Sequence, residues 1–165
     1  MMKAIEQLKN TLIQENDLYG QVLKLEMEKT NIIRKGKVKE LELITKKEQQ
    51  FITSMGTFER IRRSIFTNTA ELLGVEELNG LSEILLYMED EAMINEIDEL
   101  RNEILKKIDE IKEVNQLNEK LMEQHLDYIH YNIELMTNQA HNDHSYGNSN
   151  QRKDKNKSNL FDARI

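Results

Sequence analysis

The sequence contains no cysteine, no proline and no tryptophan. Without cysteine, the chain can form no disulfide, no thiolate nucleophile and no cysteine-based metal site. Strand-rich and loop-rich folds use proline at their turns, so its absence favours long uninterrupted helices. Aromatic residues make up only 5% of the chain, which argues against a deep ligand pocket.

The chain also lacks a positive charge balance and a long apolar run. Its formal net charge is −7, and no basic face is evident that could neutralise phosphates, which argues against nucleic acid as the main partner. No apolar stretch approaches the roughly 18 residues of a membrane span. The N-terminal sequence MMKAIEQLKN begins an amphipathic helix without the apolar core of a signal peptide. We therefore expect a cytoplasmic protein.

Apolar residues recur at three- and four-residue steps through most of the chain, which is the helical period. This period predicts three long helices, near Met2–Arg34, Val38–Leu73 and Glu91–Asn138, and one short helix around Leu81–Met88. Lys35-Gly36-Lys37 is a short break between the first two helices, and short breaks join antiparallel neighbours. Glu15 and Lys29 are expected at the edge of the first apolar stripe. The expected fold is all-α: a long antiparallel three-helix bundle or coiled coil with a short connector helix.

The composition changes after Asn138. Residues 139–165 are polar and rich in Asn until the final LFDARI, with five basic and three acidic residues. Such a segment buries too little apolar surface to order itself. We expect two parts: a helical domain over residues 1–138 and a disordered C-terminal tail over 139–165.

The third long helix changes character along its length. Up to Ile111 its stripe is aliphatic, whereas beyond Val114 it mixes apolar residues with Asn and His. This helix is also longer than the other two by roughly 20 Å at 1.5 Å per residue. In an up-down-up arrangement, residues from about Leu121 onward would extend past the hairpin, and an exposed apolar strip marks a protein-binding site.

Polar residues on this stripe have two interpretations. Asn115, Asn118 and Asn132 either set the register of the packed helices or belong to a partly hydrated surface that a partner covers. Met122 and Met136 either fill a core or adapt to an irregular partner. The residue pattern leaves both questions open.

Residues suited to chemistry are present but poorly arranged for it. His141, Asp143 and His144 could bind a metal, but a polar tail offers no fixed geometry or supporting shell. The acidic run over residues 89–99 favours the N-terminus of a helix and is expected to be solvated. There is no Gly-rich phosphate loop and no Ser/His/Asp arrangement on a scaffold. We expect no catalysis, no cofactor and no metal.

The third helix from Ile111 to Met136, IKEVNQLNEKLMEQHLDYIHYNIELM, resembles that of the FlgN-type flagellar type III export chaperones. Val114-Asn115-Gln116-Leu117-Asn118 is similar to the polar patch of that family's C-terminal helix. The first hairpin is similar through Leu12, Glu15 and Tyr19, through Lys29, Ile32 and Gly36, and through Leu41, Thr45, Glu48, Gln49, Glu59 and Arg62. Ser145-Tyr146-Gly147 and LFDARI are similar to tails of the family's Gram-positive branch.

The resemblance implies a cytosolic chaperone for flagellar hook-filament junction proteins, the FlgK- and FlgL-like hook-associated proteins. Such a chaperone binds the helical C-terminal segment of its client, prevents premature assembly and delivers it to the export gate. The client-binding residues are then expected on the third helix, at Asn118, Leu121, Met122, His125, Leu126, Ile129, Ile133 and Met136. The family's gate-docking tyrosine corresponds to Tyr146.

Two other classes of function stay open. A structural coiled coil or adaptor protein would self-associate stably without any client. A helical enzyme or metal protein would need a coherent His and Glu cluster, which the sequence lacks.

Overall fold

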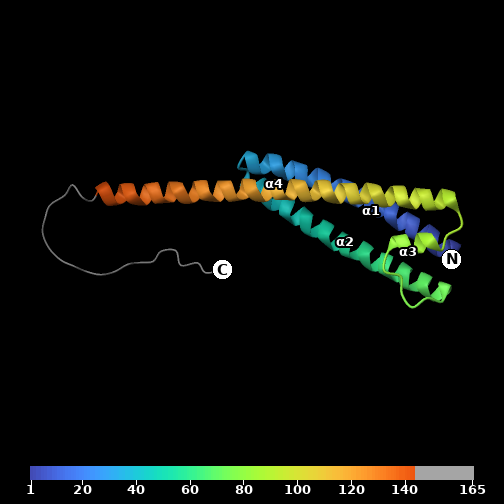
Figure 1. Cartoon of the computed structure of the whole chain (residues 1–165). Coiled ribbons are helices and arrows are strands. Elements are labelled where there is room, and N and C mark those ends of the chain that lie inside the picture. Colours follow the sequence, from blue (N-terminus) through green and yellow to red (C-terminus); the bar gives the residue numbers. More distant parts are fainter. Residues whose placement is uncertain (144–165) are drawn as a thin grey trace. The chain divides into compact units, whose positions relative to one another are not determined.

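The computed structural model describes the backbone of residues 1–143 and the side chains of residues 1–139. These residues form four α-helices and no strand: α1 (Met2–Arg34), α2 (Val38–Leu73), α3 (Leu81–Leu86) and α4 (Glu91–Asp143). The expected all-α fold is confirmed (Figure 1). The chain divides into two compact units, Met1–His125 and Leu126–Ile165, called unit 1 and unit 2 below and described separately.

Two helix ends differ from the prediction. The short helix α3 ends at Leu86, before the expected Met88, and α4 continues past Asn138 to Asp143. The second difference has a simple cause, because residues 139–143 contain neither Gly nor Pro and Ala140 favours a helix. The expected tail from residue 144 onward lies outside the described residues, and the domain boundary after residue 138 stays a prediction.

Glycines in the left-handed conformation end α1 and α2. Gly36 has φ 65° and Gly74 has φ 67°, a region that a residue with a Cβ enters only at a cost. After α1, the Lys37 N–H donates to the Ile32 carbonyl and the Gly36 N–H to the Ile33 carbonyl. Paired hydrogen bonds of this kind define the Schellman motif. The chain therefore reverses within a few residues and returns as α2.

Two ion pairs set the register of α1 against α2. Arg62 contacts both carboxylate oxygens of Glu15 at 2.9 Å, and Lys29 Nζ lies 2.7 Å from Glu48 Oε1. The residue numbers of the two pairs add up to the same value, as they must when two helices run in opposite directions. The hairpin expected from the short break is therefore present.

In unit 1, α4 runs parallel to α1. Asn16 Nδ2 donates to Glu103 Oε2 at 2.6 Å, and Thr30 Oγ1 donates to Asn118 Oδ1 at 2.6 Å. The sequence separations of these pairs are 87 and 88 residues, and a nearly constant separation is the register of parallel helices. Together with the hairpin, this gives the up-down-up order within unit 1 (Figure 1).

The main core of unit 1 lies where all four helices meet. Its buried members are Ile5, Leu8, Leu12, Ile65, Ala70, Leu78, Ile84, Ile97 and Ile104. A smaller cluster of Leu25, Ile32 and Ile44 lies toward the α1–α2 turn. The isoleucines of the aliphatic half of the α4 stripe thus pack as the helical period predicts.

The apolar stripe of α2 is covered only in part. Ile44 and Ile65 are buried, but Ile52, Ile61 and Leu72 are exposed. The helical period identified the residues that share a face of α2. It did not predict how much of that face is covered by another helix. An uncovered apolar face on α2 was not expected.

Glu15 was expected at the edge of the α1 stripe, and the structure corrects this placement. Its exposed fraction is only 2%. Burial raises the pKa of its carboxyl, and the neighbouring Arg62 guanidinium opposes that shift. The side chain is tolerated inside because the guanidinium hydrogen-bonds both of its oxygens.

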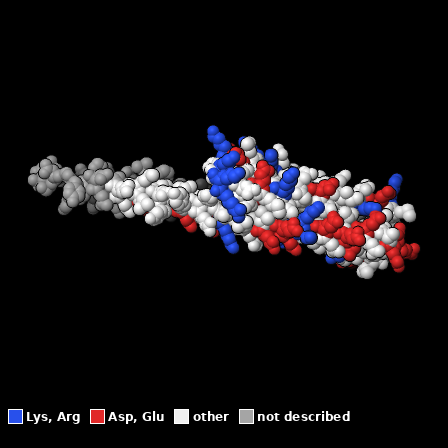
Figure 2. All heavy atoms as spheres, turned by 90° about the horizontal axis from the view of Figure 1, so that it is seen from above, with Lys and Arg blue, Asp and Glu red and all other residues white. Residues whose placement is uncertain are grey.

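Charge is unevenly spread over unit 1. Figure 2 shows Lys and Arg gathered at the end that carries the α1–α2 turn, where Arg34, Lys35, Lys37 and Lys39 are exposed. Asp and Glu gather toward the opposite end, at the exposed residues Glu76, Glu89, Asp90 and Glu91 among others. The two ends of unit 1 therefore differ in which sign of charge is more abundant.

Candidate functional site

An exposed apolar row follows the helix of unit 2. It consists of Leu126, Ile129, Ile133 and Met136, called the strip below, at steps of three and four residues. Their exposed fractions are 55%, 52%, 55% and 70%. Side chains at these steps share one face of a helix. All four were expected in a protein-binding surface, and the structure places them on one exposed face.

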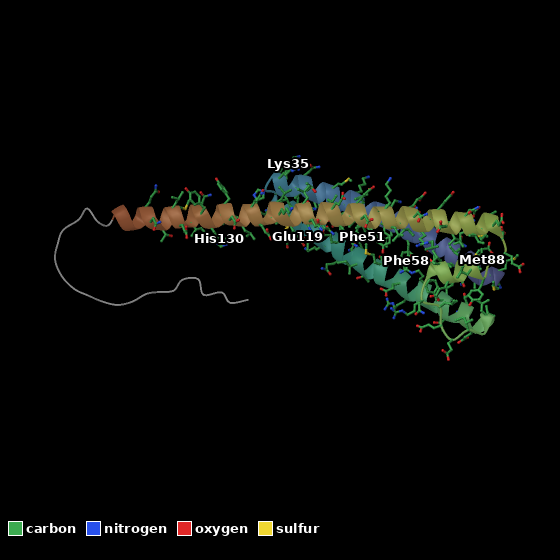
Figure 3. The ribbon with its side chains drawn as sticks, in the orientation of Figure 1. Lys35, Phe51, Phe58, Met88, Glu119 and His130 are labelled. Atoms are coloured by element: carbon green, nitrogen blue, oxygen red, sulfur yellow. The ribbon has the colours of Figure 1, made fainter. Side chains whose placement is uncertain are left out.

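The surroundings of the strip are poor in charge. Between Leu126 and Gln139 the only charged side chains are Asp127 and Glu134, and no Lys or Arg occurs between Lys120 and Arg152. In Figure 2 the described part of unit 2 is accordingly drawn almost entirely white. His130, labelled in Figure 3, is exposed on the same helix. The segment thus presents apolar surface with a sparse acidic border.

A second exposed row, which the single-stripe interpretation missed, lies on the same segment. Tyr128, Tyr131 and Leu135 have exposed fractions of 65%, 59% and 43%. These residues also repeat at steps of three and four. The signal was present in the sequence as a second helical row out of phase with the first.

The remaining expected binding residues belong to unit 1. Leu121 is half-buried, whereas Met122 and His125 are exposed. Asn118 differs from the rest, because its exposed fraction is 2%. Its side chain is enclosed between α1 and α4 and is not available on the surface of this structure.

Asn118 completes a buried polar layer. Its Nδ2 atom donates to the Glu26 carbonyl at 3.1 Å and lies 3.3 Å from Glu26 Oε2, while its Oδ1 accepts from Thr30 Oγ1. A buried amide that forms several hydrogen bonds across an interface fixes the register of two helices. Of the two interpretations left open for this residue, the placement favours register control.

Glu26 carries the largest electrostatic effect in this layer. Burial raises the pKa of its carboxyl to about 7, and hydrogen bonding and charge repulsion with Glu48 of α2 add to the shift. Lys29 and the Asn118 amide act in the opposite direction. Glu26 is 4% exposed, so the charged form of its carboxyl has little access to water. The layer therefore contains a carboxyl that titrates near neutral pH.

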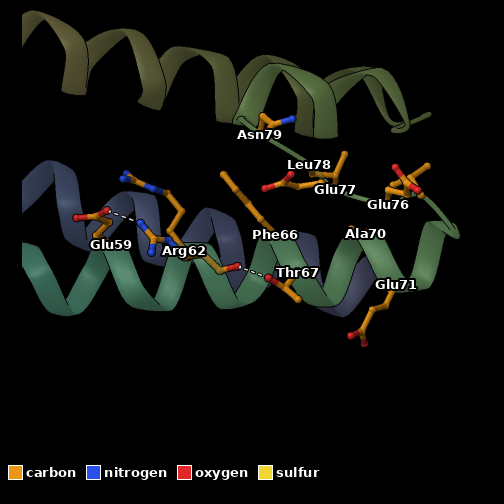
Figure 4. Close-up of a pocket in the computed structure, with 12 residues that line it drawn as sticks. Glu59, Arg62, Phe66, Thr67, Ala70, Glu71, Glu76, Glu77, Leu78 and Asn79 are labelled. Atoms are coloured by element: carbon orange, nitrogen blue, oxygen red, sulfur yellow. Dashed lines mark hydrogen bonds and ion pairs between the residues drawn. The ribbon is translucent and has the colours of Figure 1, made fainter.

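Two of the surface hollows in unit 1 lie beside α2. One, of about 390 Å³, lies among α1, α2 and α4 and is lined by apolar side chains that include Phe51, Ile52 and Ile111. Figure 3 labels Phe51 on α2. The other, of about 600 Å³, lies between α2 and the segment before α3 (Figure 4). Its lining is mainly charged, with Glu59 paired to Arg63 by a bond of 3.0 Å. The lining of neither hollow includes His, Cys or Ser.

Several expectations concern residues that cannot be placed. Tyr146, the expected gate-docking residue, lies outside the described part of the chain, as does His144, and the side chains of His141 and Asp143 are not described. Among the described residues, no group of three or more His, Asp or Glu could hold a metal. Within that same part, every helix is too short or too polar to cross a membrane.

Comparison with known proteins gives two matches. A family model described as FlgN protein matches residues 1–154. The Bacillus subtilis protein YvyG, described as uncharacterized, is 28% identical over 138 residues, which cover 84% of this chain and 81% of YvyG. No solved structure matches the chain significantly. The family match spans the whole of unit 1 and the described part of unit 2.

Proposed function

This chain belongs to the FlgN family of flagellar export chaperones, and on that premise we propose the details of its function. It binds the helical C-terminal segment of flagellar hook-filament junction proteins, the FlgK- and FlgL-like hook-associated proteins, in the cytoplasm. Binding prevents premature assembly of the client. The chaperone then delivers the client to the flagellar type III export gate.

The exposed strip of unit 2 is the observation that carries this proposal. Four large apolar side chains on one helical face are each more than half exposed, and exposed apolar surface of this kind marks a site of protein association. An amphipathic helix binds such a face through anchors at steps of three and four residues. The terminal helix of a subunit that assembles through helical packing offers a matching face. Covering that face would block premature assembly.

The free energy of burying apolar side chains gives the expected loss of client affinity in strip variants. Complete burial of one Leu or Ile side chain is worth about 1.5–3 kcal/mol. Two truncations on the strip should therefore weaken binding by roughly 100-fold or more, at 1.4 kcal/mol for each factor of ten. Because these side chains are already exposed without a client, the same truncations should change the stability of the free chaperone little.

The test uses the full-length chaperone with the full-length FlgK- and FlgL-like proteins of the same organism. Leu126→Ala combined with Ile129→Ala is compared with Gln116→Ala combined with Lys120→Ala, whose exposed positions lie on α4 in unit 1, outside the strip. Calorimetry should show the affinity loss for the first variant alone, and circular dichroism should show unchanged melting for both. Intact affinity in the strip variant would contradict the proposed binding face.

Delivery to the gate rests on family membership alone. The assignment of gate docking to Tyr146 stays a prediction, and binding of the gate protein to a Tyr146→Ala variant would check it. Stable self-association is the competing function, and sedimentation of the purified chain without client separates the two. A client-dependent chaperone should not form a rod-like oligomer by itself.

A further inference from the structure

The helix of unit 2 has two apolar faces rather than one. At about 100° of rotation per residue, the second row of Tyr128, Tyr131 and Leu135 is centred roughly 150° from the strip. A helix packed along one side of another contacts an apolar stripe about 100° wide. One partner helix that covers the strip therefore leaves the second row exposed.

Polar side chains separate the two faces in a specific order. On the helical projection, Asp127, His130 and Glu134 fall between the strip and the second row on one side, and Asn132 and Gln139 fall between them on the other. One seam is thus acidic and the other is made of uncharged amides. No Lys or Arg lies on this segment to neutralise the acidic seam.

We propose that the client places two amphipathic helices against unit 2, one on the strip and one on the second row, with basic residues along the acidic seam. The proposal deepens the proposed function and rests on it. The occupant is specified by chemistry: two apolar helical faces to match two apolar rows, and Lys or Arg edges to complement Asp127 and Glu134. In the bound state, the helix of unit 2 is the central element of a three-helix layer.

Affinity measurements with three variants test the proposal. The strip variant is Leu126→Ala with Ile129→Ala, and the second-row variant is Tyr131→Ala with Leu135→Ala. The control is Gln116→Ala with Lys120→Ala, at exposed α4 positions in unit 1. The probes are the full-length FlgK- and FlgL-like proteins of the same organism. The second-row variant should weaken binding of at least one probe by about 30-fold or more, from the burial of two large side chains.

The possible outcomes distinguish failure of the two-helix arrangement from failure of the proposed function. If the strip variant loses affinity and the second-row variant keeps it, the two-helix arrangement is wrong while the proposed function stands. If neither variant loses affinity, the proposed function fails and the inference fails with it. If the second-row variant changes sedimentation of the free chain instead of client affinity, that row binds a second copy and the inference is overturned.

The burial of the second row by client can also be measured directly, so that a loss of affinity with another cause is recognised. With fluorotyrosine in the full chain, the ¹⁹F signals of Tyr128 and Tyr131 should both lose their solvent isotope shift when client binds. Tyr87 in unit 1, which is 44% exposed, serves as the control and should keep its shift. A Tyr128 signal that stays solvent-exposed in the saturated complex would overturn the proposal even if the second-row variant binds weakly.

Discussion

Isoleucines on α4 have opposite surroundings in the two units. Ile97 and Ile104 of unit 1 are 0% and 6% exposed, whereas Ile129 and Ile133 of unit 2 are more than half exposed. All four follow the same helical period on one continuous helix. The comparison teaches that periodicity determines which side chains share a face, while burial requires a neighbouring helix to cover it. Unit 1 supplies such neighbours in α1, α2 and α3.

Two asparagines of α4 show the same difference between unit 1 and unit 2. Asn118 in unit 1 is fully hydrogen-bonded inside the bundle, and Asn132 in unit 2 is half-buried with no side-chain bond to another helix in the described structure. Every buried side-chain nitrogen or oxygen among the described residues has a hydrogen-bond partner. Unit 1 therefore has the satisfied interior of a folded domain, and the described part of unit 2 presents an exposed surface.

The largest expected effect is the loss of stability when the buried isoleucines of unit 1 are truncated. Ile97→Ala with Ile104→Ala should cost roughly 4–10 kcal/mol of unfolding free energy, since each buried Ile→Ala change costs about 2–5 kcal/mol. A loss of this size approaches the whole stability of a domain. Thermal melting followed by circular dichroism should show unit 1 unfolded or strongly destabilised. Wild-type-like melting would show that the core is not where the structure places it.

An intermediate effect is expected at the buried ion pair. Arg62→Ala leaves the Glu15 carboxylate inside without its partner, and the expected cost is about 2–4 kcal/mol, reduced from the fully buried case because Arg62 is 32% exposed. The matched control is Arg63→Ala, which removes a pair with Glu59 whose side chains are 77% and 60% exposed. Denaturant unfolding should show almost no change for the control. Equal losses in the two variants would contradict a special role for burial.

The smallest expected effect is a pH dependence at Glu26. Its folded pKa is about 7 and its ordinary value is 4.5, so the folded state binds more protons than the unfolded state between these values. Stability from this group therefore falls as pH rises from about 4.5 to 7. The charged groups around it are Glu48 on α2, Lys29 on α1 and Lys112 on α4.

Glu26→Gln removes this titration while keeping the size and polarity of the neutral side chain. The variant should match the wild type below about pH 4.5 and exceed its unfolding free energy by on the order of 1–3 kcal/mol above pH 7. Urea unfolding at several pH values, compared with wild type, checks the sign. A stability difference that is independent of pH would show that Glu26 does not titrate in the layer.

Much of the fold could be predicted from local signals. The absence of proline, the long helical periods and Gly36 and Gly74 are sufficient to locate α1 and α2 to the residue. The end of α4 was less predictable, because a change to polar composition at Gln139 does not by itself stop a helix. The strip was also predictable, since its four residues share one helical face whatever the tertiary structure.

What the sequence determined by itself was therefore the set of helices, the faces that they carry and the family to which they belong. Only the tertiary structure decided which faces are covered. Glu15 is buried because Arg62 reaches it from α2, and Asn118 is buried because Glu26 and Thr30 lie opposite it on α1. Helical period is a property of neighbours along one chain, but burial and hydrogen-bond satisfaction depend on side chains that meet from distant segments.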